Sequence, residues 1–363
     1  PTGVRRFQPP EPPEPWRRAR DATRAGPVPI QPSVPLFRFL NAGGTRQSEN
    51  CLSLNVWTPG LDAARRPVLV WIHGGAFLIG AGSTPVYEGH DLSRRGDIVV
   101  VTINYRLGAL GYIHLNGVCG EQFSDACNAG LRDQIAALEW VRDNIDRFGG
   151  DPGKVTVFGQ SAGAMSVGAL LGAPRARKLF HRAICQSGAT QHVLSQDQAN
   201  QIAEAFLGKL GGPPRTPEAL AGIPASRLLK AQGVINRELA NLERLMVFLP
   251  VVDGEVIPEP PLEAVKRGAV ADVPILLGTT LDEWKLFTPV DTGIPAIGER
   301  GLVERMAEIL PSAAPRAPTA ARAIRSYRKA VKARGGDTSP FEIWSAFQSA
   351  RVFHYPATQL AEA

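Results

Sequence analysis

Residues 155–164 read VTVFGQSAGA and connect an apolar run to a segment of small residues. The apolar run is typical of a strand covered on both faces, and residues 164–171 are typical of a buried helix. The GQSAG between them matches G-x-S-x-G, in which both glycines leave room for a tight, strained turn. We predict that Ser161 lies on this turn, after a strand ending near Phe158 and before a helix starting near Ala162. A hydroxyl at a helix N-terminus, where partial positive charge favours a developing anion, is a candidate nucleophile.

Short apolar runs recur on both sides of this turn, and helical patterns lie between some of them. The clearest helix is expected over residues 131–148, whose apolar residues follow three- and four-residue steps. Strands that alternate with helices predict an α/β fold with a doubly wound, mainly parallel sheet. We expect strands at residues 52–57, 68–72, 98–105, 155–158, 183–185 and 273–277.

The chain has 363 residues and is expected to form one domain over residues 1–363. Residues 1–48 are rich in proline and arginine and predict extended surface chain. Residues 195–245 and 300–350, approximately, show helical patterns without strands, and we interpret them as helical insertions on one sheet. The chain begins at Pro1 without a signal-peptide pattern and stops at Ala363 within a helical pattern, so both ends are expected to be cuts.

A second motif follows the expected strand at residues 68–72. Residues 73–77 read HGGAF, and paired glycines after a strand allow backbone N–H groups to point at a ligand. The motif matches the oxyanion loop that accompanies G-x-S-x-G, with Ala76 in place of a third glycine. We therefore expect the N–H groups of Gly75, Ala76 and Ala162 to form an oxyanion hole. His73 is expected to be a structural loop residue.

Composition excludes several other classes of protein. The formal net charge is +6, but the basic residues are scattered, which argues against a nucleic-acid partner. Apolar runs are too short for a membrane span, and His and Cys residues show no metal-ligand spacing. The four cysteines form no evident disulfide pattern, which favours the cytoplasm. They are Cys51, Cys119, Cys127 and Cys185.

Four further segments, together with these motifs, resemble the type-B carboxylesterase family, which contains carboxylesterases, cholinesterases and para-nitrobenzyl esterases. They are SENCLSLNV at 48–56, NYRLG at 104–108, NAGLRDQ at 128–134 and FGGDP at 148–152. The resemblance covers the whole chain, is closer to bacterial members, and implies an α/β-hydrolase fold. It also implies hydrolysis of small to medium carboxylic esters through an acyl-enzyme, with no cofactor. Structural ion pairs between Arg106 and Asp133 and between Arg6 and Glu49 are implied in the same way.

The resemblance also implies a catalytic acid. The family carries it in a Gly-x-x-x-Asp-Glu-Gly stretch, which residues 278–284, GTTLDEW, match except at Trp284. The role therefore falls to Glu283, with Asp282 as the alternative. A carboxylate just past a strand's C-terminal end also lies where α/β sites collect their functional groups.

The general base is harder to find. Acyl transfer by serine needs a histidine, which follows the acid in this fold's chain order. Only His354 follows Glu283, and it lies in a helical pattern rather than a loop after a strand. Relatives carry the base further along, in a Gly-x-x-His segment that residues 1–363 lack, so we expect the base beyond Ala363.

Two rival functions stay open at this level. The same serine chemistry serves amide, carbamate and thioester substrates. A binding module without activity, as in the adhesion proteins that resemble cholinesterases, is the second rival. Such modules typically lose the serine, whereas Ser161 is retained. Oligomeric state is not indicated by any pattern in the chain.

Overall fold

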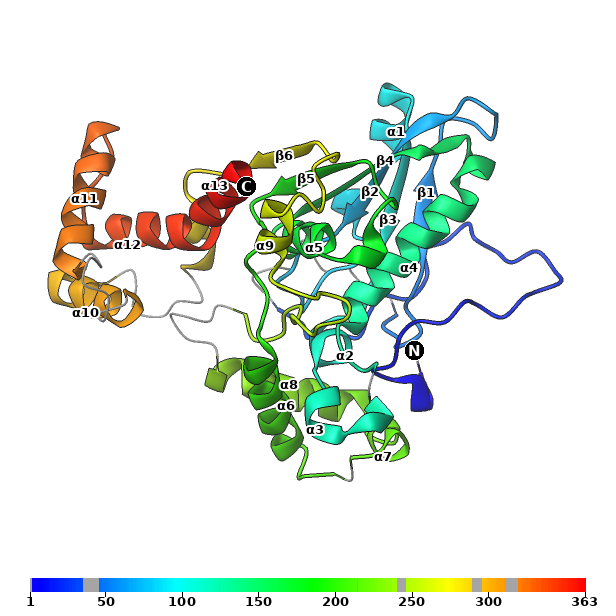
Figure 1. The fold of residues 1–363 in the computed structure, drawn as a ribbon, viewed down its shortest axis with the longest axis horizontal. Coiled ribbons are helices and arrows are strands. Elements are labelled where there is room, and N and C mark those ends of the chain that lie inside the picture. Colours follow the sequence, from blue (N-terminus) through cyan, green and yellow to red (C-terminus); the bar gives the residue numbers. More distant parts are fainter. Residues whose placement is uncertain are drawn as a thin grey trace.

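The structure is a computed structural model that describes residues 2–34, 46–123, 125–213, 215–239, 246–288, 296–310 and 319–363. Its centre is a six-stranded sheet of order β1-β3-β2-β4-β5-β6 (Figure 1). The strands are β1 (Leu54–Trp57), β2 (Arg66–Ile72), β3 (Val99–Ile103), β4 (Gly150–Gln160), β5 (Arg182–Gln186) and β6 (Ile275–Gly278). All six strands that we expected are present, with ends that differ by several residues.

The sheet is mixed but mostly parallel. Strand β1 pairs antiparallel with β3, whereas the pairs β2–β3, β2–β4, β4–β5 and β5–β6 are parallel. Strand β4 runs five residues earlier and two later than its apolar run because pairing with β2 begins at Gly150 and pairing with β5 extends to Gln160. Strand β3 is buried at every position, as expected of a strand covered on both faces.

Helices α4 (Ala129–Asn144), α5 (Ala162–Leu171) and α9 (Pro261–Lys266) form a layer in which α5 contacts both others. Every residue of α5 is buried, which explains its small side chains. A Cβ at Gly168, for example, would lie 2.5 Å from the Ala189 carbonyl oxygen. The helix expected over residues 131–148 is α4, continued by the short 3₁₀ helix η5 (Ile145–Phe148). Smaller helices near the strand ends are α1 (His90–Gly96), α2 (Gly108–Tyr112), α3 (Asn116–Cys119), η3 (Pro85–Tyr87), η4 (Glu121–Phe123) and η6 (Pro174–Ala176).

The segment after β5 is helical, as expected, where the structure describes it. Helices α6 (Gln196–Lys209), α7 (Pro217–Ala221) and α8 (Ala225–Leu239) lie beside α2 and α3 (Figure 1). A capping box starts α6. The Ser195 hydroxyl accepts from the backbone N–H of Gln198, and the side-chain oxygen of Gln198 accepts from the backbone N–H of Ser195. Residues 240–245 lie outside the described part of the chain.

A second helical group projects from the β6 side of the sheet (Figure 1). It contains η7 (Glu283–Phe287), α10 (Glu299–Ile309), α11 (Ala320–Ala333) and α12 (Pro340–Ser349). Helix α12 continues through a π-helical turn, η8 (Ala350–His354), into α13 (Tyr355–Glu362). Among the described residues, every helix is too short or too polar to cross a bilayer.

Residues 11–25 are exposed and outside any helix or strand, as expected of extended surface chain, whereas the first residues differ from that expectation. The N-terminal segment begins with a 3₁₀ helix, η1 (Gly3–Arg5), and both Arg6 and Phe7 are buried. The Arg6 guanidinium donates to the carbonyls of Leu220 and Ile223, which ties η1 to the α7 region. The sequence pattern does not predict this burial, because the segment is held by contacts with residues far along the chain and not by a local periodicity.

Candidate active site

Ser161 lies between β4 and α5 with φ 56° and ψ −125°. A positive φ is uncommon outside glycine and stores strain of about 1–3 kcal/mol when the surrounding structure enforces it. Here the Ser161 N–H donates to the Gln186 carbonyl at 2.8 Å, and its own carbonyl accepts from Met165 N–H at 2.9 Å. The predicted strained turn is therefore present, although its strand ends at Gln160 rather than near Phe158.

Both glycines of the turn are sterically required. A Cβ at Gly163 would lie 2.0 Å from the Ile72 carbonyl oxygen, and one at Gly159 would lie 2.4 Å from the Gly163 carbonyl carbon. Real Cβ atoms do not approach backbone this closely, so any side chain would push α5 away from the sheet. The two glycines thus set where the Ser161 side chain is presented.

The loop after β2 lies directly against this turn. A Cβ at Gly74 would lie 2.6 Å from the Gln160 carbonyl oxygen and 3.3 Å from the Ser161 Cβ. Gly75 has φ 110°, and Ala76 and Phe77 have φ 56° and 59°. Among the described residues, the N–H groups of Gly75 and Ala76 donate to no protein acceptor. Ala162 is the first residue of α5, so its N–H precedes the helix's own hydrogen-bond ladder.

The buried side chain of His73 stabilises this loop. Its ring stacks on Tyr105 with centroids 4.4 Å apart, and its Nδ1–H donates to the Gly74 carbonyl at 2.8 Å. The Tyr105 hydroxyl in turn donates to the His73 carbonyl at 2.7 Å. Burial lowers the pKa of His73 to about 4, although its hydrogen bond to Gly74 opposes the shift. A neutral, fully enclosed imidazole agrees with the structural role expected for His73.

The acid segment follows β6, the neighbour of β5. Glu283 Oε1 accepts from the Ser187 hydroxyl at 2.6 Å and from the Thr280 N–H at 2.7 Å. Asp282, by contrast, is exposed and lies 3.3 Å from the Lys285 ammonium. Geometry therefore favours Glu283 over Asp282 as the carboxylate that is held in place.

Ser187 was not anticipated from the sequence. It follows β5 directly, has φ 56°, and donates its N–H to the Gly278 carbonyl at 2.7 Å. A serine two residues after the short apolar run at 183–185 is the local signal that could have indicated it. Its contact with Glu283 spans 96 residues of sequence, so the partner could not be inferred without the fold.

None of the six histidines, all of which the structure describes, makes a hydrogen bond with Ser161 or Glu283. His354 contacts the acid segment at another point, where its Nε2 lies 2.8 Å from the Thr280 carbonyl oxygen. His114 lies 2.9 Å from the Cys127 sulfur, and His181 accepts from the Val155 N–H. The described residues thus bring together a serine, two loop amides and a carboxylate, without an imidazole between serine and carboxylate.

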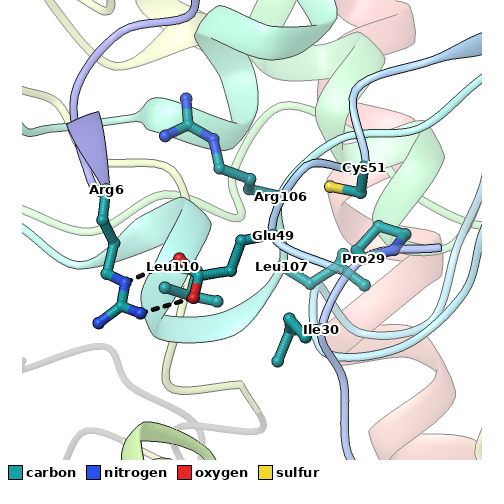
Figure 2. Close-up of a pocket in the computed structure, with 8 residues that line it drawn as sticks. All are labelled: Arg6, Pro29, Ile30, Glu49, Cys51, Arg106, Leu107 and Leu110. Carbon is teal, nitrogen blue, oxygen red and sulfur yellow. Dashed lines mark hydrogen bonds and ion pairs between the residues drawn. The ribbon is translucent and has the colours of Figure 1, made fainter. Parts of the chain in front are cut away.

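The two ion pairs implied by the resemblance are present, away from Ser161. Arg6 bonds to Glu49 at 2.7 Å, and Arg106 bonds to Asp133 at 2.7 Å and 2.6 Å. Arg6, Glu49 and Arg106 line a small cavity of about 10 Å³ with five other residues (Figure 2). This volume corresponds to about one water molecule, so we assign the cavity to the scaffold. The other lining residues are Pro29, Ile30, Cys51, Leu107 and Leu110.

Cys51 faces the same cavity and is a free thiol, as are the other three cysteines. Burial raises the pKa of Cys51 to about 12, with a further contribution from the Asp133 carboxylate. Pro29 lines the same cavity.

Comparison with known proteins places this geometry in context. The family model described as "Carboxylesterase family" matches residues 1–359. Para-nitrobenzyl esterase of Bacillus subtilis (strain 168) is 44% identical over 322 residues, covering 86% of this chain and 65% of that protein. Phenmedipham hydrolase of Pseudarthrobacter oxydans is 40% identical, over 78% of this chain and 56% of that protein. The chain therefore spans less than two thirds of the length of these relatives.

Solved structures agree with the sequence comparison. The crystal structure of a carboxylesterase from Geobacillus stearothermophilus at pH 6.2 superposes with a TM-score of 0.87 and 42% sequence identity. It covers 99% of this chain, which covers 70% of that one. The fold is that of the α/β-hydrolases, and the chain belongs to the carboxylesterase family.

Proposed function

We propose that the protein is a serine carboxylic-ester hydrolase in which Ser161 is the nucleophile. The observation that carries the proposal is the contact between two strained turns. The Ser161 turn lies against the loop of Gly75 and Ala76, whose N–H groups have no acceptor among the described residues. Such donors beside a raised serine suit the negative charge that develops on an ester carbonyl oxygen.

The proposed reaction has two steps. In the first, Ser161 Oγ attacks the ester carbonyl carbon while a base takes the hydroxyl proton. The N–H groups of Gly75, Ala76 and Ala162 hold the tetrahedral oxyanion, each donor contributing about 100- to 1,000-fold in rate. The alcohol leaves with the proton, and an acyl group remains on Ser161. In the second step, water attacks this acyl-enzyme, the carboxylic acid product is released, and the serine recovers its proton.

Glu283 is proposed as the acid that orients the base and balances its charge. It is held by Ser187 and Thr280 at the end of β6, on the sheet edge where β4 presents Ser161. A carboxylate in this role keeps the imidazole in the correct tautomer and stabilises the imidazolium that forms. No cofactor enters this scheme.

We propose that the base is a histidine outside residues 1–363. The support is that none of the six histidines, all of them among the described residues, makes a hydrogen bond with Ser161 or Glu283. The length of the relatives leaves room for such a residue. On this proposal, residues 1–363 are one catalytic domain that holds nucleophile, acid and oxyanion hole, with helical insertions around residues 195–245 and 300–350.

The substrates proposed are small to medium carboxylic esters. The test uses a short-chain nitrophenyl ester with the full-length protein, the 363-residue chain and Ser161→Ala in each. Full-length protein should turn over, and Ser161→Ala should lower kcat by about a millionfold. The 363-residue chain should retain at most about 1,000- to 10,000-fold over water, which the oxyanion hole and binding can supply. Equal turnover by the two lengths would reject the external base, and full activity of Ser161→Ala would reject the mechanism.

A further inference from the structure

Residues 278–282, which precede Glu283, have little packing to hold them, whereas Trp284, which follows it, is buried. Gly278 and Thr280 are exposed, as are the intervening residue and the two that follow. An exposed backbone segment with few apolar contacts opens easily.

One helical element, α12 with its π turn η8, contacts this segment and holds it in place. The Trp284 N–H donates to the Ser349 hydroxyl at 3.0 Å, and this contact is buried. Five residues further on, His354 Nε2 lies 2.8 Å from the Thr280 carbonyl oxygen. A carbonyl oxygen can only accept, so His354 carries the hydrogen on Nε2 and donates it. These two contacts bracket Glu283 on both sides.

The π turn explains how both side chains reach the same segment. In an α-helix, residues three or four apart share a face, and residues five apart do not. A π turn closes i→i+5 hydrogen bonds, so Ser349 and His354 are brought nearly above one another. Such turns are rare and frequently occur at functional sites. In a regular α-helix Ser349 and His354 would lie on different faces, and the π turn brings them closer to one face.

The contacts at Thr280 link His354 to the carboxylate. The Thr280 carbonyl is held by His354, while its N–H donates to Glu283 Oε1 at 2.7 Å. The two peptide groups that flank the Thr280 Cα are therefore both fixed. If the His354 contact is lost, the Thr280 backbone can rotate, and its N–H no longer fixes the direction of the Glu283 carboxylate.

We propose that His354 is a positioning residue for the acid, acting through Thr280 and made possible by the π turn. This inference rests on the proposed function, in which Glu283 orients the base. His354 does not touch the nucleophile or substrate in this scheme. It lowers the number of orientations that the carboxylate can adopt, and so it should affect turnover more than substrate binding.

The test compares His354→Leu, which removes the donor, with His354→Gln, whose amide N–H can still donate to the Thr280 carbonyl. Tyr355→Phe is the matched control, because Tyr355 is the next, exposed residue, and within the described part of the chain its hydroxyl only accepts a hydrogen bond from Gln359. Full-length proteins are assayed with a nitrophenyl ester. We expect His354→Leu to lower kcat by about 3- to 10-fold with KM within about twofold, the scale of one hydrogen bond. His354→Gln and Tyr355→Phe should stay within about twofold of the unmodified protein in kcat.

A second readout does not depend on turnover. Hydrogen exchange of the backbone around residues 279–284 should be faster in His354→Leu than in His354→Gln, and the melting temperature should be the same in both. Unchanged kcat in His354→Leu, or a fall that His354→Gln shares, would overturn the inference. A loss of about a millionfold would overturn it too, because that would make His354 the base itself. Glu283→Gln in the same assay separates the two proposals, since its full activity would defeat the proposed function independently of His354.

Discussion

The Ser187 hydroxyl donates a hydrogen bond of 2.6 Å to the Glu283 carboxylate across the ends of β5 and β6. The end of β5 also bonds to both neighbouring strands. The Ser187 N–H donates to the Gly278 carbonyl, and the Gln186 carbonyl accepts from the Ser161 N–H. A short chain of hydrogen bonds therefore runs from the nucleophile turn to the acid segment over three adjacent parallel strands. Strand pairing therefore brings the two segments together, and the hydrogen bonds from Ser187 and Thr280 hold the carboxylate between them.

Glu283→Gln should lower kcat by about 1,000- to 10,000-fold in the full-length protein, because an amide holds the base in the wrong tautomer. Asp282→Asn is the matched control. Asp282 is exposed, and its carboxylate pairs with Lys285 among the described residues, so its loss should change kcat by less than about twofold. Steady-state kinetics with a nitrophenyl ester measure both. A large loss in Asp282→Asn with a small one in Glu283→Gln would reverse the assignment.

Ser187→Ala should lower kcat by about tenfold or more, since a hydrogen bond to a charged group is removed from Glu283. KM should change little because Ser187 is not expected to touch the substrate. Ser326→Ala, which removes a hydroxyl at an exposed position of α11, provides the control and should be neutral. Activity of Ser187→Ala equal to that of the unmodified protein would show that Thr280 alone can hold the carboxylate.

Gly163→Ala should destabilise the fold by several kcal/mol, because the new Cβ would lie 2.0 Å from the Ile72 carbonyl oxygen. Gly233→Ala, in the interior of α8, is the matched substitution. Its nearest neighbour is the end of the Arg237 side chain at 3.7 Å, so it should stabilise by about 0.5–1 kcal/mol. Denaturant unfolding of both variants checks the opposite signs, and a stable Gly163→Ala protein would contradict the steric argument.

His73 should make stability depend on pH. Its pKa is about 4 in the folded protein against 6.5 for an ordinary histidine, so the unfolded chain binds the proton first. The contribution of the neutral His73 ring to the free energy of unfolding is therefore complete above pH 6.5 and decreases as the pH falls toward 4. His73→Phe removes this titration. Its stability deficit relative to the unmodified protein should therefore shrink by about 2 kcal/mol between pH 8 and pH 5.

Denaturant unfolding at several pH values measures this difference. Tyr105→Phe is the control, because it removes the hydroxyl that donates to the same loop but no histidine. Its deficit should stay constant over the same pH range. A deficit of His73→Phe that is equally constant would mean that His73 is not buried as a neutral ring.

Sequence alone determined the features that depend on local chemistry. The strained serine turn, the glycine loop before it and the apolar strands all follow from residue types at short spacing. The glycines of G-x-S-x-G illustrate this, because their spacing around Ser161 predicts a tight turn, although the atom that a Cβ at Gly163 would meet, the Ile72 carbonyl oxygen, is known only from the fold. The choice between Glu283 and Asp282, in contrast, rested on resemblance, because adjacent carboxylates carry no local signal that separates them.

Only the tertiary structure decided which distant groups meet. Ser187 reaches Glu283, and His354 reaches Thr280, because parallel pairing of β5 with β6 and a π turn after α12 bring them together. Arg6 is buried for the same kind of reason, since two of its acceptors, the carbonyls of Leu220 and Ile223, lie more than 200 residues away. Hydrogen bonds over such separations depend on the packing of whole elements. Local periodicity contains no information about that packing, and the orientation of the acid is therefore a property of the fold.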